Sequence, residues 1–87
     1  MKREEEYFDG RELVLVYIAR KLREALAVEG LMTEAGIDYL VEVDTYIGGI
    51  IFRGERAGAF FYVEEAGRDG AAALLREKGY RPQADQA

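Results

Sequence analysis

The sequence predicts a single α+β domain, and three observations support this class. The chain has 87 residues, of which 49% are hydrophobic and 11% aromatic, so it can bury one small core but not two. Residues 13–18 (LVLVYI) and 59–63 (AFFYV) are apolar at every position, as in strands that are covered on both faces. Residues 20–35 and 68–78 instead carry apolar side chains at helical spacing. Strands with helices packed on them around one small core make an α+β protein.

The first half of the chain predicts a strand followed by a helix. A turn at Asp9-Gly10 precedes residues 13–18, whose valines, isoleucine and tyrosine favour a buried strand. The helix is expected over residues 20–35, and Gly36 stands where a left-handed residue would end it. The main apolar stripe of this helix consists of Ala25, Val28, Leu31, Met32 and Ala35.

The same helix carries a second, smaller apolar spot. At about 100° per residue, Leu22 and Leu26 point well away from the main stripe, with Glu29 between. We expect these two leucines to contact a flanking loop or the amino-terminal Tyr7-Phe8 segment, rather than to line a groove for a partner helix.

The second half predicts an edge strand, a hairpin and a buried strand. Residues 37–45 alternate between apolar and polar side chains, which favours a half-exposed strand at the edge of a sheet. Gly48-Gly49 suits a tight turn into residues 50–52. A polar loop at residues 53–58 then leads to the buried strand at 59–63.

A second helix and a short C-terminal segment follow. The helix is expected over residues 68–78 and ends at Gly79. Residues 80–87 are expected to form either a short edge strand, limited by Pro82, or a frayed tail. The domain thus divides into a charged lead-in at 1–10, a core at 11–79 and the C-terminal segment at 80–87.

The order of these elements predicts a ferredoxin-like βαββα(β) sandwich, an antiparallel sheet with two helices on one face. The first and third strands are central in this arrangement, which matches the two fully apolar segments. Strict alternation along the strands places Val14, Val16, Ile18, Phe61 and Val63 under the helices. The uncovered face then consists of Leu13, Leu15, Tyr17, Phe60 and Tyr62.

This uncovered face is the candidate interaction surface. A chain without cysteine has no disulfides to compensate for a small core, so burial against another copy would add the missing stability. We therefore expect a homo-oligomer, with a dimer favoured, that forms through the sheet face. A different protein partner is the alternative.

A glycine-centred segment is the second candidate site. It consists of Tyr46, Ile47, Gly48, Gly49, Ile50, Ile51 and Phe52. Large apolar residues on a glycine hinge would suit a clamp for a ligand or partner. They would equally suit a structural hairpin that completes the core or the dimer interface. The sequence leaves both interpretations open.

The residue inventory argues against catalysis. The 87 residues include no His, Cys, Ser, Asn or Trp, which removes the usual nucleophiles and bases except threonine, lysine, tyrosine and the carboxylates. Imidazole and thiolate metal ligands are missing as well, and the acidic residues at 4–6 and 64–65 are typical of solvated charge. We expect no enzymatic activity, no metal and no cofactor.

Charge and hydropathy limit the partners. The amino terminus, MKREEE, is too acidic for a signal peptide, and no apolar run approaches the roughly 18 residues that span a bilayer. We expect a cytoplasmic protein without a membrane partner. The net charge of −5, with acidic and basic residues interspersed, disfavours nucleic acid.

Two alternative functions stay open. RNA-recognition domains share this strand and helix order, and Val16-Tyr17-Ile18 and residues 56–60 (RAGAF) partly match their base-stacking segments. A single-stranded RNA binder would stack bases on Tyr17 and Phe60. The other alternative is a small-molecule sensor or enzyme with an apolar pocket between sheet and helices.

Several short motifs between residues 13 and 79 carry a family resemblance. They are LVLVYI at 13–18, Glu24-Ala25, Gly30-Leu31-Met32, Ala35-Gly36-Ile37 and, less closely, Glu64-Glu65 and residues 71–75 (AAALL). These motifs resemble the small bacterial family labelled signal transducing protein, whose fold is similar to that of the PII nitrogen regulators. The resemblance implies a PII-like fold, a tendency to oligomerise and a role in signal transduction. It carries over no catalytic or nucleotide-binding residue.

Overall fold

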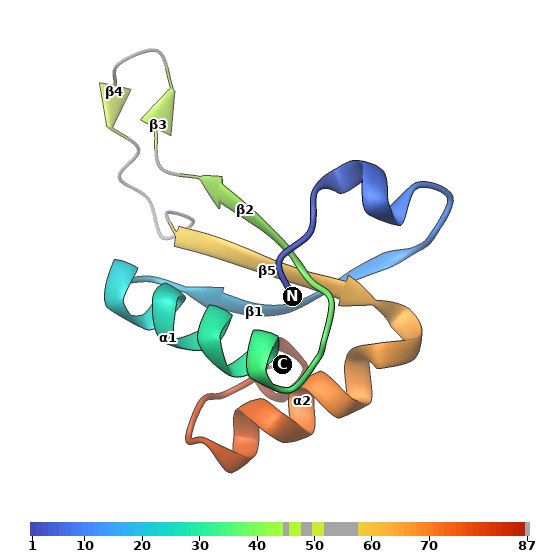
Figure 1. Ribbon diagram of the computed structural model, residues 1–87. Coiled ribbons are helices and arrows are strands. Elements are labelled where there is room, and N and C mark those ends of the chain that lie inside the picture. The colour runs from blue at the N-terminus through green and yellow to red at the C-terminus, as the bar shows by residue number, and fades with distance from the viewer. Residues whose placement is uncertain (45, 48–49, 52–57, 87) are drawn as a thin grey trace.

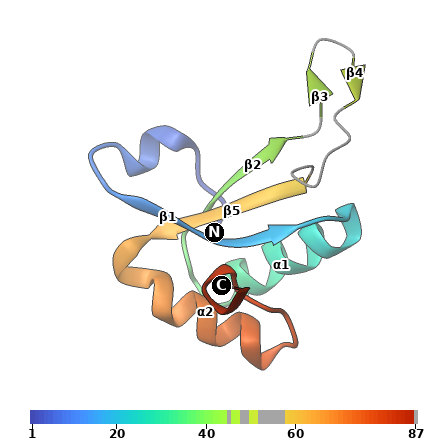
Figure 2. The same ribbon diagram turned by 180° about the vertical axis from the view of Figure 1, so that it is seen from behind.

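The computed structural model describes residues 1–44, 46–47, 50–51 and 58–86. The chain forms an α+β domain with a three-stranded antiparallel sheet and two α-helices, so the predicted class is confirmed. Across the sheet the strands are β1 (Leu13–Ala19), β5 (Gly58–Glu64) and β2 (Leu40–Asp44). The helices α1 (Leu22–Glu34) and α2 (Arg68–Glu77) lie on the same side of the sheet (Figure 1, and from behind in Figure 2).

Shorter elements complete the described part of the chain. Strands β3 (Tyr46–Ile47) and β4 (Ile50–Ile51) pair as an antiparallel hairpin that extends beyond the end of β2 (Figure 1). The predicted turn residues Gly48 and Gly49 lie outside the described residues. Three 3-10 helices precede β1, precede α2 and follow α2: η1 (Glu5–Phe8), η2 (Glu65–Gly67) and η3 (Gln83–Gln86).

The central strand of the sheet is β5, as predicted, but β1 is not central. Among the described residues no strand pairs with the outer side of β1. In place of the predicted edge strand or frayed tail, the C-terminal segment forms η3, which lies against β1. Pro82 is buried, and Asp85 accepts hydrogen bonds from Nε and Nη2 of Arg76 at 2.7 and 2.9 Å. Because proline has no N–H for a ladder, this segment packs instead of pairing.

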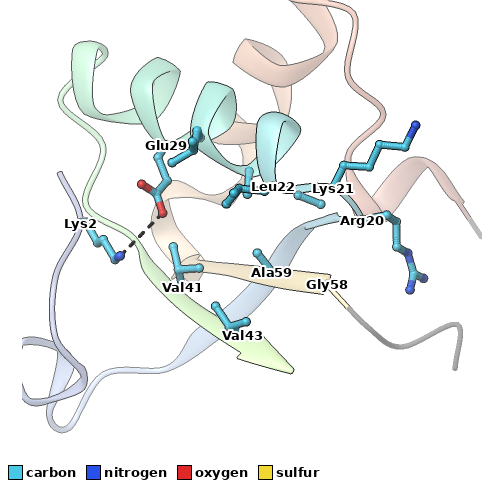
Figure 3. Close-up of a pocket in the computed structure, with 12 residues that line it drawn as sticks. Lys2, Arg20, Lys21, Leu22, Glu29, Val41, Val43, Gly58 and Ala59 are labelled. Carbon is cyan, nitrogen blue, oxygen red and sulfur yellow. Dashed lines mark ion pairs between the residues drawn. The ribbon is translucent and has the colours of Figure 1, made fainter. Parts of the chain in front are cut away.

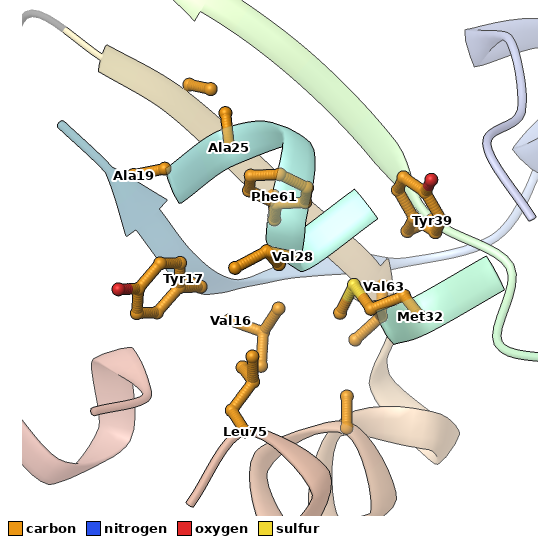
Figure 4. Packing of buried hydrophobic residues seen from close by; sticks show 12 residues of the cluster. Val16, Tyr17, Ala19, Ala25, Val28, Met32, Tyr39, Phe61, Val63 and Leu75 are labelled. Carbon is orange, nitrogen blue, oxygen red and sulfur yellow. The ribbon is translucent and has the colours of Figure 1, made fainter. Parts of the chain in front are cut away.

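The core fills the space between the sheet and the two helices (Figure 4). The helices contribute Ala25, Val28, Met32, Ala71 and Leu75, and the sheet contributes Val16, Phe61 and Val63. Val14 is partly buried against the same cluster. Four of the five residues predicted under the helices are therefore placed there, and the fifth, Ile18, is not.

A β-bulge in β1 explains this exception. Leu15 pairs with Tyr62, but the next paired residue is Tyr17, opposite Phe61, so Val16 is an extra residue in β1. The extra residue reverses the alternation beyond it. Tyr17 turns into the core, where its side chain is 6% exposed, and Ile18 turns to the face opposite the helices. The prediction that Tyr17 lies on the uncovered face was wrong because it assumed strict alternation.

The buried Tyr17 ties β1 to the start of α1. Its hydroxyl donates a hydrogen bond to Oε2 of Glu24 at 2.6 Å, and the N–H of Arg20 donates to Oε1 of the same carboxylate at 3.1 Å. The ring also packs edge-on against Tyr80, with centroids 5.7 Å apart. Burial, together with the hydrogen bond to Glu24, raises the pKa of Tyr17 well above its ordinary value.

This raised pKa predicts a loss of stability at high pH. As the pH passes about 10, Tyr17 ionises in the unfolded chain but keeps its proton in the folded one, so the free energy of unfolding falls. Tyr17→Phe should lower the free energy of unfolding by about 1 kcal/mol at pH 7. It should also make the fall in this free energy between about pH 9 and 11 smaller, because phenylalanine does not ionise. Tyr62, whose pKa is also raised by burial, accounts for part of the remaining slope. Urea titrations at each pH measure both effects. A slope unchanged by Tyr17→Phe would contradict the burial of Tyr17 and its bond to Glu24.

Candidate functional site

The face of the sheet opposite the helices carries a patch of apolar side chains, which we call the sheet face. The strand register places Leu15, Tyr62 and Leu40 in one row and Ile18 and Phe60 in the next. All five are half-buried, and Glu42, which completes the second row, is exposed. Burial, and to a lesser extent the charge of Glu42, raises the pKa of Tyr62 above its ordinary value.

The structure places four of the five predicted interaction residues on this side of the sheet: Leu13, Leu15, Phe60 and Tyr62. Tyr17 is in the core, and Ile18 occupies the position predicted for it. Leu40 was not predicted for this face, because the other residues on its side of the edge strand, Glu42 and Asp44, are acidic. Its apolar character was the available signal.

The amino-terminal lead-in occupies one end of the sheet, on the side away from the helices (Figures 1 and 2). It begins at the outer edge of β2, where the N–H of Arg3 donates to the carbonyl of Tyr39 at 2.8 Å. It then passes through η1, in which Phe8 is buried, and reaches β1. There Arg11 forms an ion pair with Glu64 at 2.9 Å. The uncovered part of the sheet face is therefore the part toward Ile18 and Phe60.

Asp38 holds this lead-in in place. Its carboxylate accepts hydrogen bonds from Nε of Arg3 at 2.9 Å and from the hydroxyl of Tyr7 at 3.1 Å. The Arg3 guanidinium also lies over the Tyr7 ring, 4.3 Å from its centroid. The hydrogen bond from Arg3 lowers the pKa of Asp38, so these contacts weaken as the carboxylate becomes protonated in acid.

A second surface is an apolar groove between α1 and β2, with a volume of about 610 Å³ (Figure 3). Its walls are Leu22 and Leu26 of α1 and Val41 and Val43 of β2. Its floor consists of small residues: Ala19, Ala25, Gly58 and Ala59. These small side chains leave the space that a larger core residue would have filled.

The groove contains the most exposed large apolar side chains in the described part of the chain. Leu22 is 75% exposed, Val43 63% and Leu26 57%. No described segment covers the two leucines, so the predicted contact with Tyr7-Phe8 is not found, and the loop at residues 52–57 lies outside the described residues. The second apolar spot on the helix was the sequence signal for this groove.

Charged residues stand at both ends of the groove (Figure 3). At one end Lys2 pairs with Glu29, with Nζ and Oε2 3.7 Å apart. At the other end lie Arg20 and Lys21, just before α1. Three of the four charged residues that line the groove are thus basic, in a chain whose net charge is −5.

The second predicted site falls largely outside the described residues. The backbone of Tyr46, Ile47, Ile50 and Ile51 forms the hairpin β3–β4, in which Tyr46 pairs with Ile51. Gly48, Gly49 and Phe52 are not among the described residues. The choice between a clamp and a structural hairpin therefore stays as the sequence left it.

Metal-binding clusters, membrane-spanning helices and known proteins give no indication of function for the described part of this chain. Within the described ranges, no three or more of His, Cys, Asp or Glu lie together in a way that could hold a metal ion. No helix in the same part of the chain is long and apolar enough to cross a membrane. No protein-family model, curated protein or solved structure matches the chain. The resemblance to the signal transducing family therefore stays a prediction.

Proposed function

We propose that this chain is a non-catalytic interaction module that self-associates, most favourably as a dimer, through the sheet face. The observation that carries this proposal is the row-by-row register of Leu15, Tyr62, Leu40, Ile18 and Phe60 on three adjacent strands. Neither helix covers these residues, and the lead-in leaves the part toward Ile18 and Phe60 open. An apolar patch with aromatic side chains loses free energy to water unless it is covered.

A second copy is the simplest cover for this patch. An apolar surface is complementary to itself, and a two-fold axis would set the same residues of both copies against each other. Phe60 and Tyr62 would supply large contact areas with few rotatable bonds. Glu42 stands at the rim, where its charge could stay in water.

The finer features of the fold fit a ferredoxin-like sandwich, which we include in the proposal. The main elements follow one another as β1, α1, β2, β5 and α2, and β5 lies between β1 and β2. The hairpin β3–β4 is then an insertion between the second and third main strands. The segment with η3 stands where a fourth strand would pair with β1. A signal-transducing role, as in the family that the sequence resembles, is consistent with a small module of this kind.

The absence of catalysis in the proposal rests on the residue inventory. Without His, Cys, Ser or Asn in these 87 residues, acid-base or nucleophilic chemistry would depend on Lys, Tyr, Thr or carboxylates. Single-stranded RNA is the weaker candidate, because Tyr17 is buried and Glu42 and Glu64 flank the remaining aromatic residues.

Sedimentation or light scattering measures the proposed self-association. At about 100 µM and 0.15 M salt the wild-type chain should have twice its monomer mass. Phe60→Asp and Tyr62→Glu should each raise the dimer dissociation constant by about 100-fold or more, because they would bury an unpaired charge at the interface. Circular dichroism verifies that the variants are folded.

The matched control is Val43→Asp, which adds the same charge in the groove, on the other side of the sheet. It should leave the mass unchanged. A wild-type chain that is monomeric at about 100 µM would contradict the proposal. A dimer that survives Phe60→Asp but not Val43→Asp would place the interface at β2 instead.

A further inference from the structure

The outer edge of β2 has backbone hydrogen-bonding groups that no described residue uses. In an extended strand the N–H and C=O of alternate residues point to the same side. Tyr39 directs both of its groups away from β5: its N–H donates to the carbonyl of Met1 at 3.1 Å, and its C=O accepts from the N–H of Arg3. Val41 and Val43, two and four residues further on, therefore point their groups outward too. No described residue pairs with them there.

The lead-in shows that this edge accepts an added strand. Lys2 and Tyr39 form a parallel β-bridge, after which the lead-in turns away toward η1. The free part of the edge begins directly after this bridge. A strand placed there would continue the line of the first three residues along β2.

The same stretch of β2 is one wall of the apolar groove. Val41 and Val43 pair with Phe61 and Ala59, so their side chains lie on the helix side of the sheet. Across the groove stand Leu22 and Leu26 of α1 (Figure 3 labels Leu22). Unpaired backbone groups and an apolar groove thus lie side by side, which is the combination that strand-adding peptides use.

We propose that this groove binds an extended, acidic peptide segment of a partner protein, which adds to β2 as a further strand. The added strand would run antiparallel to β2, the reverse of the lead-in, so that the peptide residues opposite Val41 and Val43 exchange backbone hydrogen bonds with them. Because paired residues share a face, their side chains would enter the groove against Leu22 and Leu26. The residue between them would face the other side of the sheet.

Charge favours this occupant over a second copy. The basic side chains of Lys2 and Lys21 stand at opposite ends of the groove; Lys2 is paired with Glu29, so the excess positive charge of the lining lies at the Lys21 end. Acidic residues that flank the apolar pair of a peptide would lie next to them. Antiparallel pairing of two β2 strands would instead bring the Lys21 end of one copy to the Lys2 end of the other. A helix in the groove would leave the outward groups of β2 unpaired.

A random heptapeptide display library, selected on the immobilised chain, is the first test. We expect enriched peptides with apolar residues at two alternate positions and Asp or Glu beside them. Val43→Asp and Leu26→Asp should abolish the enrichment. Lys21→Glu should weaken the best peptide by about tenfold at low salt, whereas Lys78→Glu, the same charge change away from the groove, should not.

N-methylated versions of the best peptide test the strand pairing itself. Methylation at the two apolar positions removes the N–H groups that would bond to β2 and should weaken binding by at least about 30-fold. Methylation at the position between them, whose N–H points away from β2, serves as the control and should change binding by less than about threefold. Fluorescence anisotropy measures all the peptides.

Three results would overturn the proposal. One is a library that enriches nothing over the Val43→Asp protein. Another is equal loss on methylation at every position, which would mean that the peptide is not paired with β2. The third is a loss of dimer mass in Val43→Asp, which would make a second copy the occupant. The first two would leave the proposed dimer of the sheet face intact, so the two proposals fail separately.

Discussion

Phe61→Ala should destabilise the fold by about 3–5 kcal/mol, a large part of the roughly 5–10 kcal/mol expected for a domain of this size. Phe61 is fully buried at the middle of the central strand. Its ring lies between Tyr17 of β1 and Tyr39, just before β2, with centroids 6.5 and 5.9 Å away. Removing it leaves a cavity that touches every strand of the sheet, and neither flanking ring can fill it without losing its own hydroxyl contacts.

Phe60→Ala is the matched control, since it deletes the same side chain one position earlier, on the opposite face. Phe60 is only half-buried, so its removal should lower the free energy of unfolding by about 1–2 kcal/mol. Urea unfolding at low micromolar concentration, where dimers add little stability, compares the two. If Phe61→Ala does not fold, Phe61→Leu should still unfold at lower urea than wild type. Equal costs for Phe61→Ala and Phe60→Ala would contradict the assignment of the two faces.

Gly58→Ala should lower the free energy of unfolding by about 2–3 kcal/mol, because the added methyl group would collide with the backbone of a neighbouring strand. Gly58 begins β5 with φ +154°, and a Cβ atom there would lie 2.5 Å from the carbonyl oxygen of Ala19 in β1. That oxygen is backbone, so it cannot rotate away as a side chain would. The ends of β1 and β5 would have to separate, which would also distort the floor of the groove.

Gly30→Ala supplies the control with the opposite sign. Gly30 lies inside α1, where an added Cβ would meet nothing within 4 Å. Alanine should stabilise the helix by about 0.5–1 kcal/mol. Thermal unfolding of both variants separates the effects: the melting temperature should fall for Gly58→Ala and rise for Gly30→Ala. A rise for both would mean that β1 and β5 are not as close as the structure has them.

Local patterns predicted the elements well. The two helices were expected at 20–35 and 68–78 and are found at Leu22–Glu34 and Arg68–Glu77. Helical spacing of apolar residues is a property of the segment itself, which is why it can be read without knowing what the helix packs on. The fully apolar run at 59–63 likewise identified the central strand.

The candidate sites depended more on contacts between distant segments. The bulge at Val16 is visible only in the pairing of β1 with β5, and it exchanged Tyr17 for Ile18 on the sheet face. The ordered lead-in depends on Arg3 meeting Asp38, 35 residues away. The groove depends on where α1 crosses the sheet, which left Leu22 and Leu26 uncovered beside β2.

The sequence by itself determined the class of the protein, the positions of its helices and central strand, and the apolar character of Leu15, Phe60 and Tyr62. These follow from the periodicity and propensity of neighbouring residues. Only the tertiary structure decided which side of β1 Tyr17 takes, which backbone edge stays unpaired and where the groove opens. Those outcomes depend on strand register and on the volumes of residues that lie far apart in the chain. A one-residue shift in strand pairing moves the side chains of a strand to the opposite face of the sheet.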